Sequence, residues 1–258
     1  MKTEIQIVSN GDELARAAAA EFVERAARAV QARGVFSVAL SGGTTPRSLY
    51  SLLASDTSLR AQVPWEHIHF FWGDERHVPP DHADSNYRMT CEAMLSKAPV
   101  RAANIHRIKG EYADAQSAAA EYEAVLREFF TLAPDALPRF DLVLLGMGPD
   151  GHTASLFPGT AALDERARLV IANWVEKFKA YRITMTLPVL NNAASVIFFV
   201  SGAEKAAVLR NVLEGERGWF PSQLIHPADG QLLWLVDAGA ASLLSTSRSP
   251  APQTHKDA

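Results

Sequence analysis

The apolar run at residues 142–145 ends in a turn rich in glycine, and this junction constrains the fold more than any other feature of the chain. Four large apolar residues without polar alternation are typical of a strand buried on both faces of a parallel sheet. The turn that follows carries Asp150 and His152. Ligands of open α/β sheets bind beyond the carboxyl ends of the strands, so the turn predicts a reactive site. Because histidine transfers protons near neutral pH, His152 is the first candidate catalytic residue.

The rest of the chain alternates between strand and helix patterns. Further strands are predicted at 4–8, 35–40, 68–72, 169–172, 183–186, 196–200 and 232–236. Helices are predicted at 14–30, from Pro46, from Asn86, at 113–130, at 204–213 and near Ala238, with Gly34 as a C-cap. This alternation predicts one α/β domain over residues 1–244, with a mainly parallel, Rossmann-like sheet between helices. The composition of residues 245–258 predicts a disordered tail.

Composition and charge exclude several classes of protein. The 258 residues are 48% hydrophobic, with a formal net charge of -4 and no long basic run, which argues against a nucleic-acid partner. No apolar stretch approaches the roughly 20 residues that span a bilayer, and the first residues are too polar for a signal peptide. Cys91 is the only cysteine, so intrachain disulfides and cysteine zinc clusters are excluded. We expect a cytoplasmic monomer or weak homo-oligomer without a membrane partner.

Polar loops follow two more of the predicted strands. In the first, Gly42 and Gly43 allow a ligand to approach the backbone, and Thr44 and Thr45 open a helix whose free N–H groups favour an anion such as phosphate. An ordinary turn with Thr45 as N-cap explains this loop equally well. The second loop begins at residue 73 and carries Asp74 and Arg76, which suit polyol binding or the orientation of a histidine. A solvated, charged turn is the alternative. Parallel topology brings all three loops to one edge of the sheet, which favours a shared site.

The turn at 146–151 also matches G-x-G-x-x-G, the dinucleotide-binding pattern. Three features argue against a nucleotide. Pro158 and Gly159 interrupt the helix that the pattern requires, Asp150 would face the pyrophosphate, and the next strand arrives too early for a βαβ crossover of roughly 30 residues. We therefore interpret this turn as a catalytic loop and predict no nucleotide cofactor.

Four further residues have two interpretations each. His67 and His69 lie two apart on a predicted strand and so share a face, which suits a metal, but an ordinary strand edge explains them as well. Arg182 precedes a strand and Lys205 opens a helix. Both are either solvated surface cations or parts of one phosphate clamp, since cations neutralise phosphate effectively. We predict no metal site.

Six segments together resemble the 6-phosphogluconolactonases, within the family that also contains the glucosamine-6-phosphate deaminases. They are Ser-Gly-Gly-Thr-Thr-Pro in 40–50, Phe-Trp-Gly-Asp-Glu-Arg at 71–76, Pro-Pro-Asp-His-Ala-Asp-Ser-Asn-Tyr-Arg at 79–88, the run 141–159, Arg-Ile-Thr at 182–184 and Ser-Gly-Ala-Glu-Lys-Ala at 201–206. The resemblance implies the fold shared with glucosamine-6-phosphate deaminase and ribose-5-phosphate isomerase. It also implies hydrolysis of 6-phospho-D-glucono-1,5-lactone to 6-phospho-D-gluconate, in the oxidative pentose phosphate pathway, without a metal or organic cofactor.

The resemblance also implies a role for each candidate residue. His152 matches the general base, Asp74, Arg76 and Asp150 match active-site positions, and residues 41–45, Arg182 and Lys205 match the phosphate-binding region. Either Asp150 holds the imidazole tautomer or its backbone shapes the turn, and either Arg76 or loop N–H groups stabilise the oxyanion. No G-x-S-x-G nucleophile motif exists, so direct attack by water is favoured over an acyl-enzyme.

Two rival functions remain open at this point. The related deaminases typically carry an Asn-Glu pair before Pro-Gly, where this chain has Leu156 and Phe157, so the carboxylate that serves ring opening there is missing. A non-catalytic sugar-phosphate sensor would keep the phosphate residues but has no need of His152 and Asp74.

Overall fold

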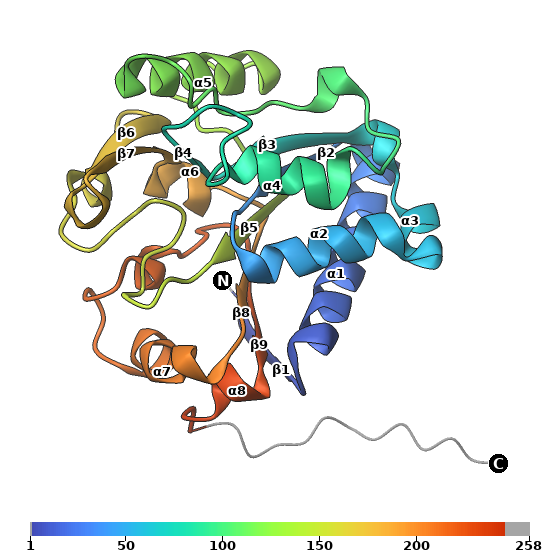
Figure 1. Ribbon diagram of the computed structural model, residues 1–258, viewed down its shortest axis with the longest axis vertical. Helices are drawn as coiled ribbons and strands as arrows, with labels where there is room; N and C mark the ends of the chain where they lie inside the picture. The colour runs from blue at the N-terminus through green and yellow to red at the C-terminus, as the bar shows by residue number, and fades with distance from the viewer. Residues whose placement is uncertain (1, 246–258) are drawn as a thin grey trace.

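Six parallel strands form the central sheet of the computed structural model, which describes residues 2–245 (Figure 1). Across the sheet the strands are β1 (Lys2–Val8), β9 (Gln231–Asp237), β8 (Ser195–Val200), β5 (Leu142–Gly146), β2 (Phe36–Leu40) and β3 (Ile68–Trp72). β2 and β8 are buried along their whole length, as apolar runs between two layers of helices require. The predicted parallel α/β fold is confirmed.

The helices lie on both sides of this sheet. α1 (Gly11–Arg33) and α2 (Thr44–Ser55) pack together on one side, and α7 (Ala206–Glu214) lies on the other (Figure 1). α1 ends at Gly34, whose φ of 74° confirms the predicted glycine C-cap. The remaining helices are α3 (Thr57–Gln62), α4 (Asn86–Thr90), α5 (Ala115–Phe129), α6 (Leu187–Asn191) and α8 (Ala238–Ala241).

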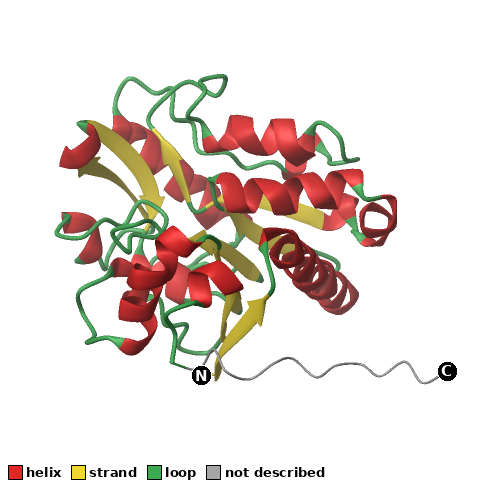
Figure 2. Ribbon diagram, turned by 60° about the horizontal axis from the view of Figure 1, so that its bottom comes forward, coloured by secondary structure: helices red, strands yellow, loops and turns green. Residues whose placement is uncertain are grey.

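A second, three-stranded antiparallel sheet was not predicted. Its strands, in spatial order, are β4 (Asp74–Arg76), β7 (Ala180–Met185) and β6 (Val170–Val175). Figure 2 shows the twisted hairpin of β6 and β7 apart from the central strands. Two predictions were therefore wrong: the runs at 169–172 and 183–186 do not join the parallel sheet, and the supposed polar loop from residue 73 contains a strand. The three charged residues of β4 show no apolar strand pattern, and the strand forms because it pairs with β7.

The structure shifts several predicted boundaries by a few residues. α2 begins at Thr44, two residues before Pro46, and a π-helical turn, Cys91–Leu95, continues α4. Short 3₁₀ turns lie at Trp65–His67, Ala102–Asn104, Ala161–Leu163, Glu176–Phe178, Ala203–Lys205 and Pro221–Leu224. Of the predicted tail, only Ser245 lies within the described residues.

Candidate active site

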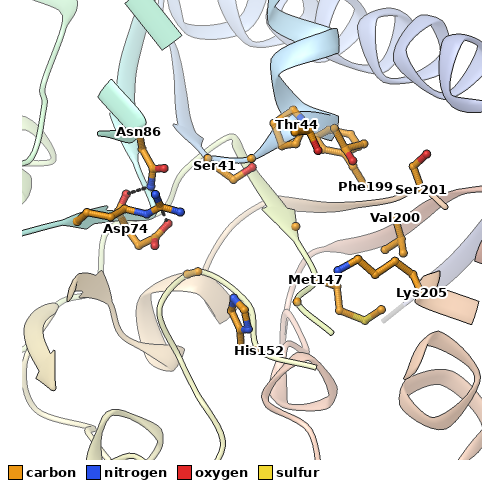
Figure 3. Close-up of a pocket in the computed structure, with 18 residues that line it drawn as sticks. Ser41, Thr44, Asp74, Asn86, Met147, His152, Phe199, Val200, Ser201 and Lys205 are labelled. Atoms are coloured by element: carbon orange, nitrogen blue, oxygen red, sulfur yellow. Dashed lines mark hydrogen bonds between the residues drawn. The ribbon is translucent and has the colours of Figure 1, made fainter. Parts of the chain in front are cut away.

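A cavity of about 230 Å³ lies at the carboxyl ends of β2, β5 and β8, beside β4 (Figure 3). Since these three strands are neighbours in the sheet, their end loops meet at one edge, as the sequence predicts. Eight of the ten predicted site residues line the cavity. They are Gly42, Gly43, Thr44, Thr45, Asp74, Arg76, His152 and Lys205. Asp150 and Arg182 lie outside its lining.

The loop between β2 and α2 presents polar groups to this cavity. The buried Tyr50 hydroxyl accepts a hydrogen bond from the Ser41 N–H (3.0 Å) and donates one to the Ser41 carbonyl (2.9 Å), which fixes the end of β2. Burial raises the pKa of Tyr50 well above its usual range, so the hydroxyl stays neutral. Gly43 supplies no side-chain cap to α2, and the buried Ser41 Oγ has no hydrogen-bond partner within residues 2–245. The first N–H groups of α2 and this hydroxyl are therefore available to an anion.

Asp74 is held on the opposite wall by hydrogen bonds from two side chains. Ser155 Oγ donates to Asp74 Oδ2 at 2.6 Å, and Asn86 Nδ2 donates to the Asp74 carbonyl at 3.0 Å. Asn86 also lies against Gly42, where an added Cβ would come within 1.8 Å of Asn86 Oδ1. A side chain at position 42 would displace Asn86, so this glycine lets the loop after β2 lie close to the residue that holds Asp74.

A buried carboxylate organises the segment that carries Asn86. Glu75 Oε1 accepts the N–H groups of Arg76 (2.8 Å) and Asn86 (2.7 Å). Its Oε2 accepts the Ser85 hydroxyl (3.0 Å) and the Tyr87 N–H (2.8 Å). Burial raises the pKa of Glu75 above its ordinary value, and these bonds offset only part of that effect. Glu75 is thus a structural acceptor for four donors.

Arg76 and Arg182 are directly opposite on β4 and β7, but only Arg76 lines the cavity. Arg76 lines the cavity, donates from Nη1 to the Asp84 carbonyl (2.7 Å), and has a buried Nε without a partner among the described residues. The Arg182 guanidinium lies over the Phe178 ring, 5.2 Å from its centroid. Burial and then the charge of Arg76 lower the pKa of Arg182. Arg182, which the sequence predicts as part of the phosphate clamp, therefore lies outside the lining of the cavity.

His152 projects from the glycine turn after β5. Its Nδ1 is hydrogen bonded to Asp150 Oδ1, which also accepts the His152 N–H at 3.3 Å. One carboxylate oxygen of Asp150 thus contacts both the imidazole ring and the backbone of the turn. The ring stacks on Phe157 with centroids 4.1 Å apart, and a Cβ on Gly148 would lie 2.0 Å from ring atoms. Burial alone would raise the pKa of Asp150, but the hydrogen bond and charge of His152 outweigh it and lower the pKa.

Lys205 lies on the β8 side of the cavity, with its amino end directed inward (Figure 3). It ends the 3₁₀ turn Ala203–Lys205, which follows β8. Asp237, at the end of β9, anchors this turn, because both its carboxylate oxygens accept the Gly202 N–H at 3.1 Å. Ser201 Oγ donates to the same carboxylate. The lysine is therefore attached to two neighbouring strands of the sheet.

Sequence reasoning missed several residues of the site. Asn86, Ser155 and Ser201 were not among the predicted site residues, although Asn86 and Ser201 line the cavity and Ser155 binds Asp74. Asn86 follows a Ser at a predicted helix start, and Ser201 directly follows a predicted strand, so each carried a positional signal. Ser155 carried none, because its partner is 81 residues away in the chain.

The histidines considered for a metal are separated in the structure. His69 Nδ1 lies 3.0 Å from His106 Nε2, whereas His67 Nδ1 lies 3.1 Å from the Gly34 carbonyl. Across residues 2–245, no three His, Cys, Asp or Glu side chains are placed to share a metal ion. No helix in the same part of the chain combines the length and the apolar character needed to cross a bilayer.

Comparison with known proteins gives consistent matches along the chain. The profile of the family described as glucosamine-6-phosphate isomerases/6-phosphogluconolactonase matches residues 9–234. The 6-phosphogluconolactonase of Nostoc sp. is 46% identical over 219 residues, 84% of this chain and 88% of the relative. That of Synechocystis sp. is 41% identical over 246 residues, 95% and 99% of the two chains.

Solved structures of similar proteins share the fold. The 6-phosphogluconolactonase of Trypanosoma brucei has a TM-score of 0.82 at 29% identity and covers 95% of this chain and 99% of its own. A monomeric glucosamine-6-phosphate deaminase has a TM-score of 0.78 at 19% identity, covering 93% and 99%, which shows a common fold alone. The family profile and the relatives at 41–46% identity lead to one conclusion: this chain belongs to the glucosamine-6-phosphate isomerase/6-phosphogluconolactonase family.

Proposed function

We propose that the chain hydrolyses 6-phospho-D-glucono-1,5-lactone to 6-phospho-D-gluconate, with His152 as general base and without a metal or organic cofactor. The observation that carries the proposal is one cavity lined by His152, Lys205 and the first residues of α2. Relatives that match most of the chain are 6-phosphogluconolactonases. The proposal includes a cytoplasmic location and a monomer or weak homo-oligomer, as expected from the sequence.

The chemistry follows from the two ring nitrogens of His152. With Nδ1–H donated to Asp150, Nε2 carries the lone pair that accepts a proton from water. The hydroxide equivalent attacks the lactone carbonyl carbon, and the tetrahedral intermediate carries the negative charge on the former carbonyl oxygen. Arg76 Nε, a buried donor in the cavity wall, suits the stabilisation of this oxyanion. Collapse breaks the bond to the ring oxygen, which takes the proton back from Nε2 and leaves the open-chain acid.

We assign the phosphate to the opposite part of the cavity, at residues 41–45 and Lys205. The α2 N-terminus and the unpartnered Ser41 hydroxyl supply neutral donors, and Lys205 supplies the positive charge. Arg182 is omitted from this assignment, because its guanidinium lies over Phe178.

The structure gives specific reasons to prefer hydrolysis over deamination. Phe157, which stands where the related deaminases typically carry a carboxylate, stacks on the His152 ring at 4.1 Å. An apolar ring in contact with the imidazole cannot accept or donate the protons that ring opening requires. A sensor that only binds would not need a His152 side chain that lines the cavity and is paired with Asp150 behind it.

Time-resolved NMR of freshly prepared 6-phosphoglucono-1,5-lactone tests the function. With the wild-type protein, the lactone signals should be replaced by those of 6-phosphogluconate much faster than in buffer. Glucosamine-6-phosphate, followed in a parallel sample, should stay unchanged. Equal lactone decay with and without protein, or release of ammonia from the amino sugar, would refute the proposal.

A further inference from the structure

The turn of the β6–β7 hairpin, residues 176–179, contacts the Asp150–His152 pair from outside the cavity. Lys177 Nζ lies 3.4 Å from Asp150 Oδ2, the oxygen that does not bond to the imidazole Nδ1. Neither Lys177 nor Phe178 lines the cavity. The turn therefore lies behind the side chains that line the cavity.

A second line of contacts joins the same turn to the imidazole through aromatic rings. Phe178 packs edge-on against Phe157, with centroids 5.8 Å apart, and the buried Phe157 stacks on His152. Arg182 lies over the outer ring of this series, and Lys177 Nζ lies 5.6 Å from the Phe178 centroid. The turn thus contacts Asp150 directly through the charge of Lys177, and it reaches His152 indirectly through the packing of Phe178 on Phe157.

We propose that Lys177 and Phe178 are positioning residues for His152: Lys177 orients and partly neutralises Asp150, and Phe178 supports the ring on which the imidazole stacks. The inference rests on the proposed role of His152 as general base. Lys177 and Asp150 are both partly exposed, with side-chain exposures of 57% and 30%, so their ion pair contributes little to folding. Variants at Lys177 should therefore fold normally, which separates positioning from stability.

The sign of the electrostatic effect follows from the three charges. The Asp150 carboxylate stabilises the imidazolium form of His152. The ammonium of Lys177 opposes this, because its positive charge partly cancels the negative charge of the same carboxylate. Without Lys177 the imidazolium persists to higher pH, so less of the enzyme carries the free base. The acidic limb of the kcat/KM profile should then move upward by roughly 0.3–0.7 pH unit, the size expected for one partly exposed charge.

Other ionisable groups around the pair stay constant in this comparison. Three of them share the cavity with His152: Asp74, Arg76 and Lys205. Five others border the surface hollows that Asp150 lines: Glu165, Arg168, Glu176, Tyr181 and Glu216. Lys177 differs from all of these, because it alone forms an ion pair with Asp150 besides His152 among the described residues.

The test compares Lys177→Met with Lys179→Met, which removes the same charge from the same turn. Both kcat/KM–pH profiles and the ring-nitrogen NMR titration of His152 are recorded. We expect the limb and the NMR midpoint to rise together in Lys177→Met, and Lys179→Met to follow wild type within about 0.2 pH unit. Superimposable titrations for the two variants would overturn the inference. If only the NMR midpoint rises, Lys177 does act on His152, but His152 is not the kinetic base, and the proposed general-base role fails instead.

The aromatic contact has its own measurement. Phe178→Ala should lower the plateau kcat by roughly three- to tenfold at unchanged KM, because the imidazole loses orientation but the cavity keeps its phosphate groups. Phe178→Leu, which restores most of the apolar volume, should recover most of that loss. A plateau kcat for Phe178→Ala equal to wild type would overturn the role of Phe178, as would a change confined to KM.

Discussion

The two sheets of the molecule supply different walls of the cavity and hold their side chains by different means (Figure 3). Strands β2, β5 and β8 are packed between layers of helices, and their apolar side chains fix the points at which the loops with Thr44, His152 and Lys205 begin. β4 has three residues, and hydrogen bonds from Ser155 and Asn86 hold its Asp74. Packing thus fixes the strands that end in one wall, whereas individual polar atoms hold the short strand of the other, so single polar substitutions beside β4 should disturb that strand more than they disturb β2, β5 or β8.

The largest expected effect is on the packed wall, at the catalytic group itself. His152→Ala should lower kcat by about 10²–10⁴, the usual contribution of a general base, with little change in the thermal midpoint. Steady-state kinetics and thermal unfolding are measured together. His226→Ala, at an exposed histidine outside the cavity lining, is the control. Activity of His152→Ala within about threefold of wild type would reject the general-base role.

A smaller but still large effect is expected where the His152 ring lies over Gly148. An added Cβ would be 2.0 Å from the ring, so Gly148→Ala must displace the imidazole. We expect kcat to fall by roughly 10–100-fold, since small misplacements of a catalytic group are costly. At Gly73, beside β4, a Cβ would make only an ordinary contact, 3.7 Å from the Leu40 carbonyl. Equal kinetics for Gly148→Ala and Gly73→Ala would show that the imidazole is not held as described.

On the wall held by hydrogen bonds, Glu75→Gln should affect stability and activity together. The amide NH₂ group would replace one carboxylate oxygen. Its N–H groups would then point at two of the four groups that donate hydrogen bonds to Glu75. We expect the free energy of unfolding to fall by about 2–4 kcal/mol. Because Asn86 would move, kcat/KM should fall by roughly tenfold as well. Denaturant titration with parallel kinetics measures both, and a variant with wild-type stability would contradict the network.

The smallest effect concerns His106, which pairs with His69 of β3 outside the cavity lining. Burial, and then the charge of His69, lower the pKa of His106 to about 4. Since an unfolded histidine titrates near 6.5, the unfolded chain binds more protons between the two values, and stability should fall as the pH drops from about 6.5 to 4. His106→Gln should flatten this dependence by at most about 2 kcal/mol, because water still reaches the ring. Its kcat near neutral pH should match wild type. If His106→Gln left the pH dependence of the free energy of unfolding unchanged, the lowered pKa of His106 would be contradicted.

The same contrast between the walls explains what could be predicted from the sequence. β3 was predicted at its observed bounds, and the loops after β2, β5 and β8 were identified, because continuous apolar runs end at glycine or hydroxyl residues. β4 could not be recognised, since Asp74, Glu75 and Arg76 show no apolar period and form a strand only by pairing with β7. The contacts of Ser155 with Asp74 and of Lys177 with Asp150 depend on how the second sheet folds back, which no local pattern encodes.

The most direct measurement compares Lys205→Ala and Arg76→Lys on two substrates, 6-phosphoglucono-1,5-lactone and unphosphorylated glucono-1,5-lactone. If the packed wall binds phosphate and the β4 wall acts on the reacting carbonyl, Lys205→Ala should raise KM about tenfold or more for the phosphorylated lactone only, because a charge-assisted contact contributes about 1.5–3 kcal/mol. Arg76→Lys should instead lower kcat for both lactones. Equal effects of Lys205→Ala on the two substrates, or an effect of Arg76→Lys on the phosphorylated lactone alone, would contradict this division of the cavity.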